Sequence, residues 1–166
     1  MPKIVRRFIQ NSFNYSVFDV ANFFLAVEKN MLQQKITHLK LQKLVYYAQG
    51  TALAFHKRTL FAEEIQAWPH GPVCPALYNR FKHTKDLPDL FGIEREKVLS
   101  LFSQNEEANQ VLTGVWQAFG DYSGSRLENM THQETPWLEA IMQGKNTVIT
   151  IEAMYKYFTQ FLPEDA

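Results

Sequence analysis

The sequence lacks most of the features that mark secreted, membrane-bound or strongly charged proteins. Its 166 residues include a single cysteine, Cys74, which excludes an internal disulfide framework and favours a reducing compartment. No apolar run approaches the roughly 20 residues that a transmembrane helix needs. The basic stretch "PKIVRR" is not followed by an apolar segment with a small-residue cleavage site. We therefore expect a cytoplasmic protein that does not engage a membrane.

An excess of charge of one sign is also missing, since 17 basic residues balance 17 acidic ones. Proteins dedicated to nucleic acid usually show a basic excess, because neutralising phosphates supplies much of their affinity. Nucleic acid is thus disfavoured as the main partner. The N-terminal group of Lys3, Arg6 and Arg7 is the single hint of an operator-binding role.

Core-forming residues, by contrast, are plentiful. Hydrophobic residues make up 46% of the chain and aromatic residues 14%, whereas a disordered chain has few aromatics and a large net charge. No internal repeat or linker-like tract divides the sequence. A chain of this length is expected to form one domain that buries roughly 70% of the surface exposed on unfolding.

Hydrophobic residues at helical spacing predict a mainly α fold. The strongest predicted helix begins after Thr37 as its N-cap and carries an apolar stripe that includes Leu41, Leu44 and Ala48. Gly50, inside that helix, either permits close approach of another element or is merely tolerated. Other helices are predicted to begin near Ser16, Pro75, Ser103, Ser125, Thr135 and Thr150.

The remaining segments complete the predicted architecture. Residues 1–15 have no clean hydrophobic period and are predicted to be an N-terminal arm, and residues 83–92 are predicted to be a loop. An extended segment bounded by Pro69 predicts a short β-hairpin around residues 58–68. The predicted fold class is therefore a single compact, mainly α domain with one short β-hairpin.

The stretch "EIQAWPHGPVCPALYNRF" raises the question of chemistry, because it places His70 close to Cys74. A structural zinc site wants four ligands, usually in two spaced pairs, and the other histidines are scattered singly. A cysteine nucleophile needs a base, an orienting group and an oxyanion hole, whereas a lone cysteine beside Val73 and Pro75 is typical of a small buried residue. Phosphate-loop, dinucleotide-binding, nucleophile-elbow and paired-histidine protease motifs do not occur. We expect no enzyme activity, metal or cofactor.

Several aromatic residues have two interpretations. Tyr46 and Tyr47 adjoin the stripe of the strongest helix, Trp68 ends the extended segment, and Trp137 begins a helix. Such residues are most often core pillars, but they are also enriched in binding hot spots. Composition and periodicity leave both interpretations open.

Three stretches together resemble a known family. "LKLQKLVYYAQG" (residues 39–50), "LFAEEIQAWPHGPVCPALY" (60–78) and "THQETPW" (131–137) resemble, in order and spacing, the signatures of the Panacea domain of phage-associated, GepA-like proteins. The resemblance covers residues 16–162 and leaves 1–15 as an arm and 163–166 as a C-terminal tail. The chain departs from the usual pattern at Thr51, His70 and Cys74, where the family often carries an aromatic residue, an aromatic residue and an aliphatic residue.

The resemblance implies the antitoxin of a bacterial or prophage type II toxin–antitoxin system, which neutralises a cognate toxin encoded by an adjacent gene through direct protein–protein binding. The alternatives are a proteolytic adaptor that delivers the toxin to a cellular protease, a DNA-binding autorepressor and a phage–host interaction protein. No residue pattern indicates an oligomeric state. The candidate motif and interaction residues are Lys43, Tyr46, Tyr47, Gln49, Trp68, His70, Gly71, Pro72, Tyr78, His132, Glu134 and Trp137.

Overall fold

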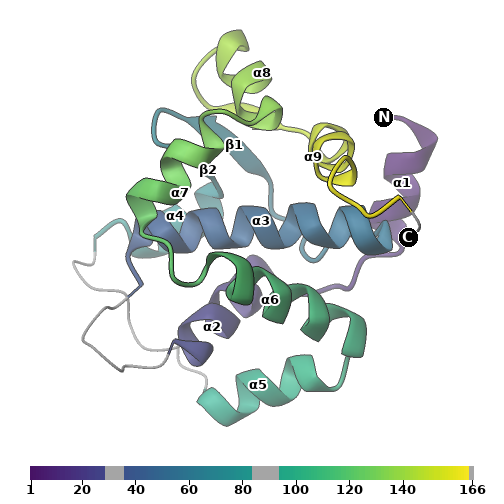
Figure 1. Ribbon diagram of the computed structural model, residues 1–166, viewed down its shortest axis with the longest axis vertical. Helices are drawn as coiled ribbons and strands as arrows, with labels where there is room; N and C mark the ends of the chain where they lie inside the picture. The colour runs from purple at the N-terminus through teal and green to yellow at the C-terminus, as the bar shows by residue number, and fades with distance from the viewer. Residues whose placement is uncertain (29–35, 84–93, 165–166) are drawn as a thin grey trace.

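A buried central helix organises the fold. The computed structural model describes residues 1–28, 36–83 and 94–164. Helix α3 (His38–His56) is buried along almost all of residues 41–54 and contacts α2, α4, α6, α7, α9 and strand β2. Figure 1 shows it crossing the middle of the molecule, with α2, α5 and α6 on one side and the strands, α7 and α8 on the other. A helix covered on all sides needs no narrow apolar stripe, and α3 accordingly buries polar as well as apolar side chains.

The other elements follow the chain in order around α3. They are α1 (Lys3–Gln10), α2 (Val17–Val27), β1 (Ile65–Trp68), β2 (Gly71–Val73), α4 (Pro75–Phe81), α5 (Arg95–Ser103), α6 (Glu106–Phe119), α7 (Gly124–Thr131), α8 (Thr135–Gln143), β3 (Thr147–Ile149) and α9 (Ile151–Thr159). Together they make one compact, mainly helical domain, as predicted. Within the described residues, no helix is long and apolar enough to cross a membrane.

The strands form a small antiparallel sheet in the order β2-β1-β3. Ala67 in the central strand pairs with Pro72 on one side and with Thr147 on the other. The predicted hairpin around residues 58–68 is therefore shifted: its first strand is β1, and its partner β2 follows a turn at Pro69 and His70. The third strand, β3, was not predicted, because it is only three residues long and is defined by pairing with a distant segment.

Several predicted helix boundaries are confirmed by their caps. Ser16 forms a capping box with Asp19 at the start of α2, Thr37 caps α3, and Thr150 caps α9. Pro75 occupies the first turn of α4, as its fixed φ angle favours. Helix α2 ends at Val27 with Glu28 as its C-cap, and most of the predicted 83–92 loop lies outside the described residues.

Other boundaries differ from the prediction. The N-terminal segment contains α1, which buries Val5 and Phe8 although Pro2 offers no side-chain cap. The cap of α6 is Asn105 rather than Ser103, because Ser103 is still helical in α5, which was not predicted. The cap of α7 is Ser123 rather than Ser125.

Gly50 has the close-approach role that was one of its two interpretations. A Cβ atom on Gly50 would lie 2.2 Å from a ring carbon of Phe158, which is far inside van der Waals contact. The missing side chain therefore allows α9 to pack its aromatic ring directly on the backbone of α3.

Candidate partner-binding site

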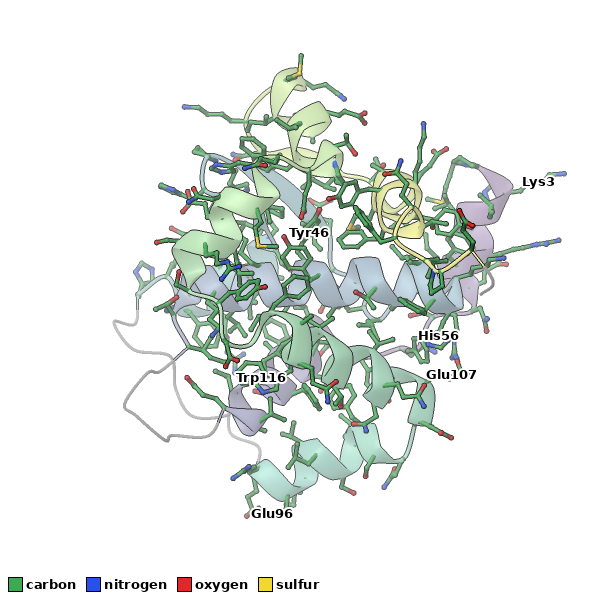
Figure 2. All side chains as sticks on the ribbon, in the orientation of Figure 1. Lys3, Tyr46, His56, Glu96, Glu107 and Trp116 are labelled. Atoms are coloured by element: carbon green, nitrogen blue, oxygen red, sulfur yellow. The ribbon has the colours of Figure 1, made fainter. Side chains whose placement is uncertain are left out.

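The predicted residues on α3 are all buried and face two different parts of the molecule. Lys43, Tyr46, Tyr47 and Gln49 each have almost no exposed surface. In a helix, side chains three or four positions apart lie on one face, so Tyr47 lies one turn beyond Lys43. Figure 2 shows Tyr46 on the side of α3 that faces α8 and α9, opposite Trp116 of α6.

Two glutamines on α3 fix the chain segments that follow it. The side-chain amide of Gln49 donates to the carbonyl of Phe61 at 2.9 Å and accepts from the amide of Leu60 at 2.7 Å. Gln42 binds both backbone groups of Cys74 in the same way, accepting from its amide at 2.8 Å. Each glutamine thus satisfies a buried donor and a buried acceptor, which are costly to leave unpaired. Gln42 was not among the predicted residues.

Residues 68–74, which we call the corner, lie against α3 and α7. Lys43 donates from Nζ to the carbonyl of Pro72 at 3.1 Å, and burial lowers the pKa of this amine to about 8, with Glu128 opposing the shift. Gly71 has a φ of +103°, and a Cβ there would lie 2.7 Å from Thr131 Oγ1 and 2.8 Å from Lys43 Cε. The corner therefore requires glycine both for backbone conformation and for space.

The outer surface of the corner carries aromatic and charged side chains. Trp68, for which the sequence left a core and a binding interpretation open, is half-buried and makes an edge contact with Tyr78 at 4.8 Å between ring centroids. The His70 side chain is 79% exposed, and its Nδ1 lies 2.9 Å from Glu128 Oε1. The corner thus presents His70 to solvent with its position set by α7.

Trp137 and His132 hold the first residue of the corner, Trp68, in place. The Trp137 indole donates to the carbonyl of Trp68 at 2.8 Å, and its ring stacks on His132 at 4.2 Å. These two predicted residues therefore connect α8 and the end of α7 to β1. They fix the end of the central strand of the sheet.

Cys74 behaves as a packed side chain. It is 1% exposed, and burial raises the pKa of its thiol to about 11, although the amides of Leu77 and Ala76 act in the opposite direction. The thiolate form that nucleophiles and metal ligands need is therefore disfavoured at neutral pH. Among the described residues, no group of three or more His, Cys, Asp and Glu side chains is arranged to hold a metal ion.

Glu134 is the centre of a second cluster, formed by helices far apart in sequence. Its carboxylate accepts from the Tyr46 hydroxyl at 3.0 Å and from the Tyr47 hydroxyl at 2.8 Å, and the hydroxyl of Tyr157 on α9 is a further donor that acts on its pKa. Burial raises the pKa of Glu134 to about 7, despite these donors. Within the described residues, no basic side chain forms an ion pair with Glu134.

The cluster borders an open apolar depression between α3, α6 and α9. Its cavity volume is about 290 Å³, and a neighbouring cavity of about 390 Å³ shares Thr51, Phe55 and Phe119 with it. Phe55 is 59% exposed and Phe161 66% exposed, so two large apolar side chains lie at the surface beside one cavity. We call this surface the aromatic groove and define it by Tyr47, Thr51, Phe55, Phe119, Met130, Glu134, Tyr157, Phe158 and Phe161.

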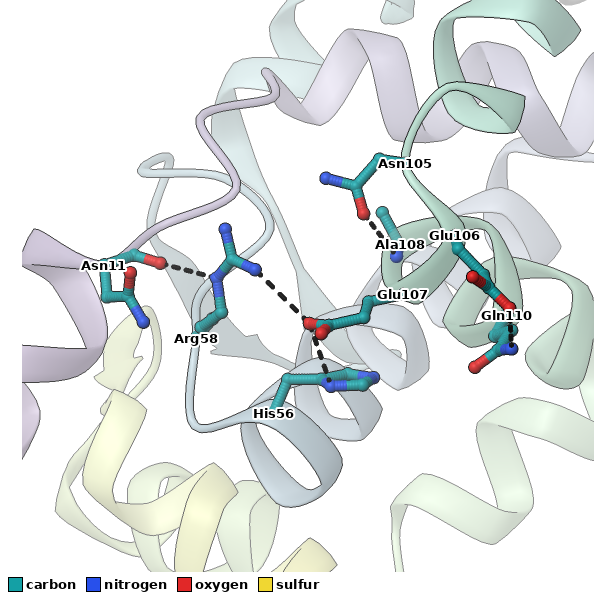
Figure 3. Close-up of polar contacts among 8 residues, drawn as sticks. All are labelled: Asn11, His56, Arg58, Asn105, Glu106, Glu107, Ala108 and Gln110. Atoms are coloured by element: carbon teal, nitrogen blue, oxygen red, sulfur yellow. Dashed lines mark hydrogen bonds and ion pairs between the residues drawn. The ribbon is translucent and has the colours of Figure 1, made fainter.

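A polar network holds the far end of the groove in place. Figure 3 shows the Arg58 side chain donating to the carbonyl of Asn11 at 2.7 Å and pairing with Glu107 of α6 at 3.3 Å. His56 Nδ1 also lies 3.3 Å from Glu107, and the Arg58 guanidinium lies 3.6 Å from the Phe13 ring centroid. These contacts join the end of α3 to α6 and to the N-terminal segment, so they set the separation of two groove walls.

The predicted residues thus belong to three groups: the corner with the side chains that hold it, the Glu134 cluster, and Gln49 with the backbone groups of Leu60 and Phe61 that it binds. The sequence did not single out Tyr157, Phe55 or Phe161, which complete the groove. Their signal was weak, because Tyr157 and Phe161 look like the apolar face of a terminal helix and Phe55 like the end of the α3 stripe.

Comparisons with known proteins place this geometry in context. A family model described as "Antitoxin SocA-like, Panacea domain" matches residues 41–138, a range that contains every predicted motif residue. Antitoxin SocA of Caulobacter vibrioides (strain NA1000 / CB15N) is 28% identical over 135 residues, which cover 77% of this chain and 71% of that protein. No solved structure matches the chain.

Proposed function

The chain belongs to the SocA-like, Panacea-domain antitoxin family, and on this premise we propose that it neutralises a cognate toxin by direct protein–protein binding. The toxin is encoded by an adjacent gene, in a type II toxin–antitoxin system. The family match over residues 41–138 is the observation that carries the proposal. Neutralisation is stoichiometric, because the toxin is held in a complex.

The aromatic groove is the surface that we assign to toxin contact. Interfaces are centred on buried aromatic anchors surrounded by a polar rim. Phe55 and Phe161 are exposed apolar side chains that line its cavity and supply such anchors, whereas His56 and Glu107 supply polar groups beside it. The corner has the different task of holding β1, α7 and α8 on α3, which supports the groove without contacting the toxin.

Co-expression tests this proposal directly. The adjacent open reading frame is expressed from an inducible promoter, with and without the protein. We expect growth arrest by the toxin alone, restored growth with the protein, and a stable complex of the two chains on size-exclusion chromatography. Equal growth inhibition in both strains would falsify the proposal.

The same strains distinguish masking from delivery to a protease. Direct binding predicts a toxin whose half-life is unchanged or longer when the protein is present. A toxin that disappears faster in its presence, and is spared when cellular proteases are inactivated, would instead identify a proteolytic adaptor.

A further inference from the structure

The Glu134 carboxylate is an unusual group to bury. A buried charge is normally compensated by an opposite charge as well as by hydrogen bonds. Here the compensation comes only from the hydroxyls of Tyr46, Tyr47 and Tyr157, and within the described residues no Lys, Arg or His forms an ion pair with it. With a pKa of about 7, the carboxyl is partly ionised at neutral pH, and the described part of the fold provides no counter-charge for its ionised form.

Hydrogen-bonding capacity also remains at this carboxylate. An ionised carboxylate offers about four acceptor sites, and the hydroxyls of Tyr46 and Tyr47 occupy two of them. Even with Tyr157 as a further donor, at least one acceptor site is left for an additional donor. Since Glu134 is one of the residues that line the cavity of the aromatic groove, that donor can come from another molecule.

The walls of the cavity favour a cation with an apolar stem. Tyr47 and Phe119 are stacked at 4.3 Å between ring centroids, and Phe158 makes an edge contact with Tyr47 at 6.0 Å. Aromatic rings attract ammonium and guanidinium groups, most strongly where water is excluded, and they pack well against methylene chains. A water molecule occupies about 30 Å³ of liquid, so a cavity of about 290 Å³ has room for a side chain.

We propose that the aromatic groove receives one basic side chain, lysine or arginine, from a partner protein, with its cationic head hydrogen-bonded to Glu134 and its methylene stem packed along the aromatic side chains that line the cavity. Acidic side chains are rejected by the carboxylate, and neutral polar ones leave its charge uncompensated. That the partner is a toxin rests on the proposed function. The preference of the groove for a basic side chain does not.

Small probes test the preference without any toxin. The protein is labelled with ¹³C at its methionine methyl groups and titrated separately with butylguanidinium and with its neutral isostere butylurea. Met130 lines the groove, whereas Met142 on α8 is 85% exposed and lies outside the groove lining, so it reports non-specific effects. We expect the Met130 signal to shift saturably with butylguanidinium, with an affinity about tenfold higher than for butylurea.

Two matched variants locate the charge. Glu134→Gln keeps the size of the side chain and removes its charge, so the two probes should bind it equally. Glu139→Gln makes the same change at an exposed position of α8 and should keep the tenfold preference. The comparison of probes on the wild-type protein needs no variant, so it holds even if Glu134→Gln does not fold.

Three results would overturn the inference: equal binding of both probes to the wild-type protein, equal shifts of Met130 and Met142, or an undiminished preference in Glu134→Gln. Neutralisation of the toxin by a protein that shows no preference between probes would leave the proposed function intact and remove this inference. A clear preference in a protein that does not neutralise the toxin would remove the proposed function and leave this inference intact.

Discussion

The corner and the aromatic groove both include contacts with side chains from neighbouring turns of α3, yet their polar groups are used in opposite ways. At the corner, Lys43 donates a hydrogen bond to a backbone carbonyl, and Gln42 forms hydrogen bonds with both backbone groups of Cys74. At the groove, Glu134 lines a cavity beside exposed aromatic rings, and among the described residues no basic side chain forms an ion pair with it. A buried polar residue in a family motif can therefore either fix the chain or stay available to a partner.

The two regions should differ in how strongly substitutions within them change the free energy of unfolding. Residues of the corner should be costly to change, because each satisfies buried groups or close packing. Substitution of the exposed residues of the groove should change the free energy of unfolding only slightly. The ionised form of Glu134 should lower that free energy. Four substitutions test these claims, in order of decreasing effect on the free energy of unfolding.

Gly71→Ala should have the largest effect. The new Cβ would meet Thr131 Oγ1 at 2.7 Å, and the φ of +103° is strained for alanine. A left-handed backbone and overpacking together cost about 3 to 4 kcal/mol. Urea unfolding followed by circular dichroism measures the loss.

Gly114→Ala is the matched control, because a Cβ on Gly114 in α6 meets nothing within 4 Å. It should raise stability by about 0.5 to 1 kcal/mol through helix propensity. Equal effects of the two substitutions would mean that the corner is not tightly fixed.

The contrast between these glycines also shows what the sequence can and cannot predict. A helix around Gly50 follows from local periodicity and from the Thr37 cap, and a turn at Gly71 follows from the flanking prolines. That Phe158 meets Gly50, and that Lys43 meets Gly71, depends on segments far apart in the chain. Local patterns predict the helices and strands, but they do not determine which distant side chain occupies the space beside a glycine.

In the candidate site, too, local patterns predict single residues, whereas the contacts between them depend on distant segments. The sequence singled out Tyr46, Tyr47 and Glu134 through motif stretches, but their convergence is a tertiary fact. The third donor, Tyr157, lies on a helix whose apolar face is locally indistinguishable from a core face. Helix α1 was missed for a related reason: its burial depends on contacts such as that of Phe8 with Tyr155, at 4.9 Å between ring centroids.

Glu134→Gln should have the second largest effect on the free energy of unfolding, and the difference between this variant and the wild type should depend on pH. The pKa of the carboxyl is raised from 4.5 to about 7 on folding, so the native state binds the proton more tightly than the unfolded state. Its contribution to stability is present below pH 4.5 and is lost as pH rises towards 7. The loss in the wild type amounts to about 3 kcal/mol, and the glutamine variant should lack it.

Unfolding free energies measured from pH 4 to pH 8 check this prediction. The tyrosines that face the carboxyl do not interfere, because their own pKa values are raised and they stay neutral in this range. Glu139→Gln should leave the wild-type pH dependence unchanged. Parallel curves for the wild type and Glu134→Gln would show that Glu134 is compensated after all, and the contrast with the corner would disappear.

Gln42→Ala should have the third largest effect. It leaves the amide and carbonyl of Cys74 without their partners in a buried environment, which costs about 2 kcal/mol. Gln110→Ala removes an exposed glutamine that contacts Glu106 at 3.3 Å and should change stability by less than about 0.5 kcal/mol. Chemical unfolding of both variants measures the difference, and similar values would contradict a clamping role for Gln42.

Phe55→Ser should have the smallest effect on folding and a large effect on binding. Since the side chain is 59% exposed, its loss should change the free energy of unfolding by about 0.5 kcal/mol or less. If the groove contacts the toxin, truncation of an aromatic anchor should weaken the complex by at least about tenfold. Met142→Ser removes another exposed apolar side chain, outside the groove lining, and should change neither quantity.

The two measurements on Phe55→Ser decide between the roles more sharply than either one alone. Unfolding in urea reports folding, and the amount of induced toxin that cells survive reports binding. A stable variant that no longer protects cells places Phe55 in the interface, because a folding defect is excluded. A stable variant that protects as well as Met142→Ser would move toxin contact away from the groove, and the exposed face of the corner around His70 and Tyr78 would become the surface to substitute next.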